Sequence, residues 1–225
     1  MSTARFSPTM TATFRAAILV IAPAVALVGN GYHPWIGNPG DPDFFDRLAA
    51  AVAADPTRWW VSHLTVAVAS GLLVLAFLAI RSYLRDAGEE QWSLLGLPFI
   101  IIGSTLYALL PAMEFAPLAA SVTGADIAEI QAALLPWFVP VLMTSAVLFA
   151  LGVLGFVMGI ARSSVLTPWL TRIVLGAFVV LAATRFLPVG AAQLYVGPAA
   201  GLVALWPLAY ATWKHPAPSA TQQPA

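Results

Sequence analysis

The feature that most constrains this chain is a series of long apolar segments. Five of them run for about 20 residues, which is enough for a helix to cross the ~30 Å hydrocarbon layer of a bilayer. Charged residues make up only 9% of the 225 residues, whereas soluble domains carry about 25%. So few charges cannot cover a soluble surface or form a nucleic-acid interface. The sequence therefore predicts an integral membrane protein built from packed helices.

A sixth, shorter apolar run lies near the N-terminus, at 16–29, behind Arg5 and Arg15. A run of this kind is typical either of a signal peptide or of a first spanning helix. We interpret it as a helix, within which Pro23 produces a kink. The prediction is an all-α bundle of six transmembrane helices in a single domain over 1–214, followed by a disordered Pro-rich tail over 215–225. The expected spans are 13–32, 59–80, 92–113, 134–160, 169–187 and 191–213.

The longest loop, 31–58, contains a second helical pattern. Phe44, Phe45, Leu48 and Val52 fall on one side of a short amphipathic helix. We expect this helix to lie on the membrane surface.

Charge distribution predicts the orientation of the bundle. Six spans place both termini on one side, which carries seven basic and three acidic residues, whereas the other side carries three basic and seven acidic residues. The positive-inside rule then places both termini in the cytoplasm, with the chain in a bacterial cytoplasmic (inner) membrane.

Several polar residues lie at a similar depth beneath the outer surface. Ionisable groups are costly in lipid, so each one is a candidate functional residue. Counting 1.5 Å per residue places His63 and Arg185 at nearly the same level. Glu114 ends the third span, and Tyr107 shares its helix face. The set is completed by residues at the outer ends of the first and last spans: His33, Gln193 and Tyr195.

Together these residues predict a polar pocket that opens outward. Such a pocket could bind a small anion or an amphiphile, or relay protons, and we expect His63 and Glu114 to approach within a direct or water-bridged hydrogen bond. Each residue also has a structural interpretation. Glu114 would be a helix end in the headgroup layer, Arg185 would extend to the surface, and His63 would be a satisfied core histidine.

Metal and haem chemistry receive little support. Cysteine is absent, and His33, His63 and Glu114 are the three side chains available for a metal, without a ligand spacing that favours one. A bis-histidine haem would need His33 and His63 to face each other across a pocket. We therefore expect no cofactor.

Two G-x-x-x-G motifs, Gly155/Gly159 and Gly197/Gly201, predict close helix contacts. Either contacts inside one bundle or a dimer would satisfy them. We favour contacts inside the bundle.

The runs DPTRWWVSHL and PAMEFAPLA, over about 50–120, resemble segments of uncharacterised bacterial multi-spanning membrane proteins of about six helices. Those proteins pair a Trp-x-x-x-His-like start of one span with a Glu near the end of the next, which here matches Trp59 or Trp60, His63 and Glu114. The resemblance implies a fold of packed helices and no particular chemistry.

Three functions are compatible with these patterns. The first is a non-enzymatic accessory or structural subunit of a membrane complex, which would have other membrane proteins as partners. The second is a binder or transporter of a small molecule or lipid that uses the outer pocket. The third is a membrane enzyme or redox protein with His63 as acid/base or ligand. Hydrolase, P-loop and dinucleotide motifs are absent, so the chain gives little support for an enzyme.

Overall fold

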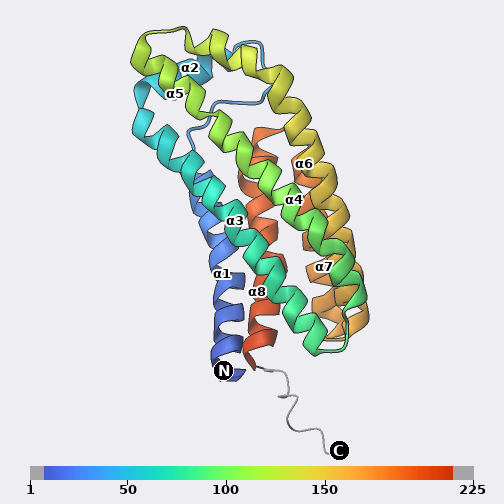
Figure 1. The fold of residues 1–225 in the computed structure, drawn as a ribbon. Coiled ribbons are helices and arrows are strands. Elements are labelled where there is room, and N and C mark those ends of the chain that lie inside the picture. Colours follow the sequence, from blue (N-terminus) through green and yellow to red (C-terminus); the bar gives the residue numbers. More distant parts are fainter. Residues whose placement is uncertain (1–7, 215–225) are drawn as a thin grey trace, which may run out of the picture.

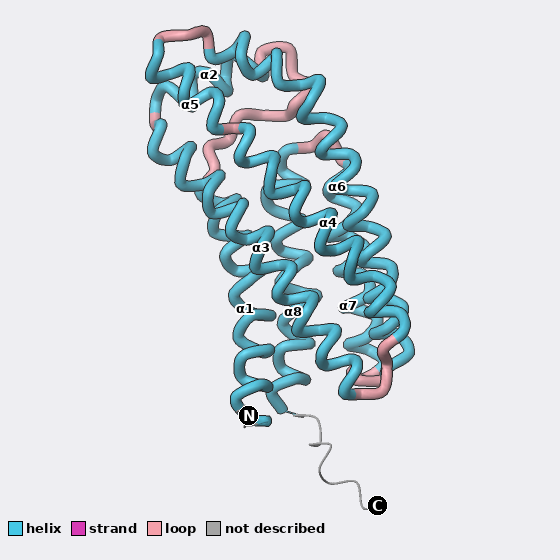
Figure 2. The backbone as a smooth tube through the Cα atoms, in the orientation of Figure 1, coloured by secondary structure: helices cyan, strands magenta, loops and turns pink. Residues whose placement is uncertain are grey.

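The computed structural model describes residues 8–214, and this part of the chain contains helices and no strand (Figures 1 and 2). The predicted tail over 215–225 lies outside the described residues. The elements in order are α1 (Pro8–Tyr32), α2 (Phe44–Ala54), α3 (Pro56–Asp86), α4 (Gln91–Met113), α5 (Phe115–Thr123), α6 (Ile127–Ser163), α7 (Pro168–Ala183), the 3₁₀ turn η1 (Thr184–Phe186), the π-helix η2 (Ala192–Val196) and α8 (Gly197–Lys214).

Six of the helical segments in the described part are long and apolar enough to cross a membrane. This confirms the predicted all-α bundle of six spans. The first described turn of α1 and the last turn of α8 lie at the same end of the bundle, and α2 and α5 lie at the opposite end (Figure 1). An even number of crossings brings the first and the last spanning helix to an end on the same side of the bundle.

Several helix limits differ from the sequence prediction. The 37 residues of α6 span about 55 Å, well beyond the hydrocarbon layer, because the helix begins at an Asp126 cap eight residues before the predicted span. The span expected over 169–187 is α-helical only to Ala183 and then tightens into η1. The next span opens as a π-helix rather than an α-helix.

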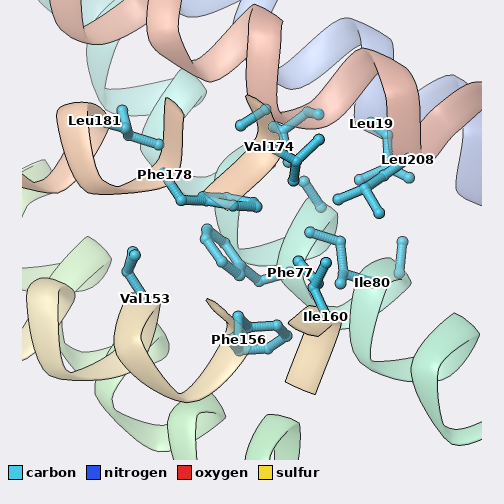
Figure 3. Close-up of a cluster of buried hydrophobic side chains, with 14 of the residues drawn as sticks. Leu19, Phe77, Ile80, Val153, Phe156, Ile160, Val174, Phe178, Leu181 and Leu208 are labelled. Atoms are coloured by element: carbon cyan, nitrogen blue, oxygen red, sulfur yellow. The ribbon is translucent and has the colours of Figure 1, made fainter. Parts of the chain in front are cut away.

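Aromatic side chains fill the centre of the bundle. The Phe77 ring lies 4.7 Å from the Phe156 ring and 5.6 Å from the Phe178 ring, centroid to centroid, so three helices meet at one point (Figure 3). Phe149 packs against Phe77 at 6.0 Å, two helical turns from Phe156 along α6. All four rings are fully buried. Without a strong hydrophobic driving force in lipid, such dense packing is what holds membrane helices together.

Helices α4 and α6 approach with backbone in contact. A Cβ added at Gly155 would lie 2.7 Å from Gly96 Cα, and one at Gly103 would lie 2.6 Å from Phe149 N. Only glycine fits at such positions. Gly197 faces Thr184 and Gly201 faces Pro23, so both G-x-x-x-G motifs are used inside the bundle, as predicted.

Helix α1 packs between α3 and α8. Leu19 and Ala22 are buried in the core, and the helix continues through Pro23. Towards its N-terminal end, Arg15 forms a 2.7 Å ion pair with Asp86 on α3. The segment that resembles a signal peptide is therefore an integral part of this bundle.

Helices α2 and α5 close one end of the bundle. Leu48 and Val52 on α2 are buried against Trp59 and Ile36, and Leu118 of α5 packs on the same cluster. The sequence prediction placed this side of α2 against the membrane surface. The structure shows that the protein itself covers Leu48 and Val52. That α2 lies on the membrane surface stays a prediction.

Candidate functional site

The structure divides the predicted site residues between two places. Tyr107, Arg185 and Gln193 line one cavity inside the bundle. His33 and His63 lie together with Trp59 in a second cluster. Tyr195 belongs to neither, since its exposed ring stacks on Trp35 at 6.5 Å.

The cavity has a volume of about 70 Å³ and is bounded by α1, α3, α4, the α7–η1 segment and the η2–α8 segment. Its lining is mostly apolar, with a small number of polar groups, as is typical of ligand sites. The polar residues are Asn30, Ser70, Tyr107, Thr184, Arg185 and Gln193.

Arg185 lies on η1, where the last turn of α7 tightens, and only 8% of the residue is exposed. Its guanidinium carbon lies 3.6 Å from the centre of the Phe149 ring and 4.2 Å from that of Tyr107. Nη1 is enclosed without a hydrogen-bond partner, and no ion pair reaches the guanidinium among residues 8–214. The side chain of Arg185 therefore does not extend to the surface, which was the structural interpretation of this residue in the sequence.

The cavity coincides with a break in regular helix. Between η1 and η2 the chain turns through Pro188 and Gly190, and Gln193 Nε2 donates to Leu187 O at 2.8 Å. This is the turn between two spanning helices, and π-helical turns such as η2 are frequent at functional sites. This break places Arg185 and Gln193 at the wall of one cavity.

The other polar side chains are partly committed to the backbone. Asn30 Nδ2 donates to Ala26 O at 2.7 Å, Ser70 Oγ to Val66 O at 3.0 Å and Thr184 Oγ1 to Leu181 O at 3.0 Å. Each of these groups keeps oxygen lone pairs that can accept a further hydrogen bond. The cavity thus offers one fixed cation surrounded by neutral polar groups.

The second cluster joins the start of α3 to the end of α1. The His33 and His63 ring centroids are 4.9 Å apart, and Trp59 lies 5.1 Å from His33 and 4.6 Å from His63. His63 Nδ1 donates to Trp59 O and His33 Nδ1 to Pro34 O, each at 2.7 Å. Burial lowers the pKa of His33 from 6.5 to about 4, and the Arg58 charge adds to the effect. The imidazole of His33 is therefore neutral at pH 7.

Glu114 has a different partner from the one that the sequence predicted. Its Oε1 accepts from Gln131 Nε2 at 2.8 Å, and its main-chain oxygen accepts from Trp59 Nε1 at 3.1 Å. The direct His63–Glu114 hydrogen bond is not formed, because the Trp59 ring packs on His63 and its indole nitrogen donates to Glu114. A bond bridged by water stays a prediction. Sequence reasoning missed Gln131, which precedes the apolar part of α6, although a Gln just before an apolar run was a signal that could have been used.

The cluster does not have the geometry of the metal or haem sites considered above. No three His, Cys, Asp or Glu side chains of the described residues gather as a metal site. His33 and His63 are in edge-to-face contact, which leaves no gap for a porphyrin plane between the two rings.

Comparisons with protein-family models, with curated proteins and with solved structures found no match to this chain. Its likeness to bacterial multi-spanning proteins therefore stays a prediction. What the chain does has to be inferred from its own residues, and what they establish is an integral membrane protein with six apolar helices.

Proposed function

We propose that this protein binds a small anionic molecule, or the anionic headgroup of a larger one, in the cavity lined by Arg185. One observation carries the proposal: a guanidinium is buried in a membrane bundle, beside a cavity, with no acid among the described residues to neutralise it. Of the alternatives drawn from the sequence, this is the binder or transporter.

The energetics of a buried cation support this role. Removing a charge from water costs several kcal/mol even after the protein relaxes. The Phe149 and Tyr107 rings offset part of this cost, since a cation–π contact contributes about 0.5–2 kcal/mol. They supply no hydrogen-bond acceptor in the plane of the guanidinium. An anionic oxygen would supply both the charge and the acceptor.

The accessory-subunit hypothesis gains no comparable support. The small-residue motifs that could have joined this chain to another helix face other parts of the bundle: Gly155 faces α4, Gly159 faces Glu89 and α3, Gly197 faces η1 and Gly201 faces α1. We place the cavity in the extracytoplasmic half of the bilayer, because the positive-inside rule assigns the terminal side to the bacterial cytoplasm.

Thermal unfolding in a neutral detergent tests the proposal. Inorganic phosphate, acetate and octanoate are added in turn at constant ionic strength. A ligand at 100 times its Kd stabilises the folded state by about 2.7 kcal/mol, so a bound probe raises the melting temperature. The critical variant is Arg185→Met. The matched control is Arg172→Met, which removes the same charge from an exposed position on α7.

We expect at least one of the three anions to raise the melting temperature of the wild type and of Arg172→Met, and to leave that of Arg185→Met unchanged. Equal effects of every anion on all three proteins would overturn the proposal.

A further inference from the structure

We infer that the ligand is a single-chain amphiphile, with its anionic head at Arg185 and its apolar chain running deeper into the membrane between α1, α3 and α8. This inference rests on the proposed function and adds the class of molecule to it. The inference rests on one observation, which is that the lining of the cavity becomes less polar from one end to the other.

The polar lining residues gather towards one end of the cavity, together with apolar Val66 at the level of Gly29, whereas the other end is lined by apolar residues. On α1 the lining runs from Asn30 to Ala22, eight residues or about 12 Å apart. On the η2–α8 segment it runs from Gln193 to Gly201, an equal distance in the opposite chain direction. In both, the amide lies at the outer end and a small apolar residue at the inner end.

Contacts between the helices show that these depths correspond. A Cβ at Gly201 would lie 3.5 Å from Pro23 Cβ, so the inner ends of the two linings are side by side. A Cβ at Gly197 would lie 2.8 Å from Thr184 Oγ1, which puts the neighbouring Arg185 near the level of Gly197. Gly201 is one helical turn deeper, about 6 Å beyond that level.

The deeper end is lined by side chains that leave space and offer no hydrogen bond. Ala22, Pro23 and Gly201 form it together with Leu73 of α3. A hydrated inorganic anion would gain nothing from this part of the cavity. A short run of methylene groups would be buried there, in line with the lipid chains outside.

Affinity for n-alkyl carboxylates from acetate to decanoate tests the inference, measured by thermal shift in a neutral detergent. Each buried methylene should tighten binding about fourfold, which corresponds to ~0.8 kcal/mol, until the cavity is filled and the affinity levels off. The n-alkanols of the same lengths serve as uncharged controls, because they report any general partitioning into the micelle.

Two glycine variants locate the chain. Gly201→Ala places one methyl group at the deep end at an ordinary contact distance from Pro23, so the helices need not move. Gly176→Ala adds the same methyl group on the exposed side of α7, where nothing lies within 4 Å. We expect the affinity of Gly201→Ala to level off at a shorter alkyl chain than that of the wild type. Its affinity for octanoate should be at least fourfold lower. Gly176→Ala should follow the wild type.

The outcomes separate this inference from the function on which it rests. If acetate binds in a way that depends on Arg185, but longer carboxylates bind no more tightly, the ligand is not an amphiphile and the anion site stands. A chain-length gain that is the same in Gly201→Ala, or that survives in Arg185→Met, would overturn the inference too. If no probe binds in a way that depends on Arg185, the proposed function fails along with it.

Discussion

At the scale of single residues, the buried polar groups of this protein differ in how well they are paired. Glu114 has Gln131 as a hydrogen-bond partner, and His63 has a main-chain oxygen. Among residues 8–214, the guanidinium of Arg185 contacts only aromatic faces. The sequence predicted that these residues share a layer, since depth follows from counting residues along a helix. It could not predict which of them meet. The Trp59 ring, almost fully buried, lies against His63 and bonds to Glu114, and no residue count reveals that.

Arg185→Met should separate stability from binding. Replacing the buried cation by an apolar side chain of similar length removes its desolvation cost of several kcal/mol. The two cation–π contacts that are lost contribute about 0.5–2 kcal/mol each. We expect the ligand-free variant to melt at or above the wild-type temperature. A melting temperature several degrees below that of the wild type would show that the guanidinium has a structural partner in the protein and does not await a ligand.

The lowered pKa of His33 predicts that the folded protein loses stability in acid. Its folded pKa of about 4 lies below its ordinary value of 6.5, so the unfolded state takes up the proton first. The contribution of neutral His33 to the free energy of unfolding is therefore complete above about pH 6.5, and it is lost as the pH falls towards 4. Arg58 and His63 are the ionisable groups that face it, and the carboxyl of Asp41, with its pKa lowered below 3.8, titrates beneath this window.

Melting temperatures of the wild type and His33→Gln between pH 7.5 and pH 4.5 measure the effect. The wild type should lose stability more steeply than the variant over this range. Parallel curves would mean that His33 is readily protonated in the folded state.

At the scale of helices, composition predicted which segments span and local chemistry set where they end. The six apolar runs became six spanning helices because a single segment can satisfy all of its own backbone hydrogen bonds in lipid only as a helix. The turn through Pro188 and Gly190 falls between two predicted spans, 169–187 and 191–213, but the 3₁₀ turn η1 and the π-helix η2 beside it were not predicted. The length of α6 was underestimated because its first turns are too polar to belong to a span, and they pack on α2 and α5 instead.

Gly155→Ala tests the tightest helix contact. The added methyl group would meet the backbone of α4, at Gly96 Cα and at Trp92 O, and neither can move aside without shifting the helix. We expect a loss of about 1–3 kcal/mol in unfolding free energy, the usual cost of overpacking. The same change at Gly176 meets nothing, and helix propensity should make it neutral or stabilising by up to about 1 kcal/mol. Indistinguishable melting temperatures for the two variants would show that α4 and α6 are further apart.

At the scale of the whole molecule, the protein is a six-helix bundle that α2 and α5 close at one end (Figure 1). A cavity lies between its helices. The chain has no cysteine, so single cysteines report position without background. Asp43, before α2, and Glu90, before α4, have well-exposed side chains. A membrane-impermeant thiol reagent should label Asp43→Cys in intact cells and Glu90→Cys only after lysis. Labelling of both from the same side would contradict the six-span topology.

The central claim, that Arg185 holds an anionic ligand, is tested most directly by native mass spectrometry of the protein purified in a neutral detergent. The wild type and the Arg172→Met control should retain a bound species that is released as an anion on activation. Arg185→Met should carry none at the same expression level. Spectra in which all three proteins carry the same adducts, or in which none carries an anion, would contradict the account.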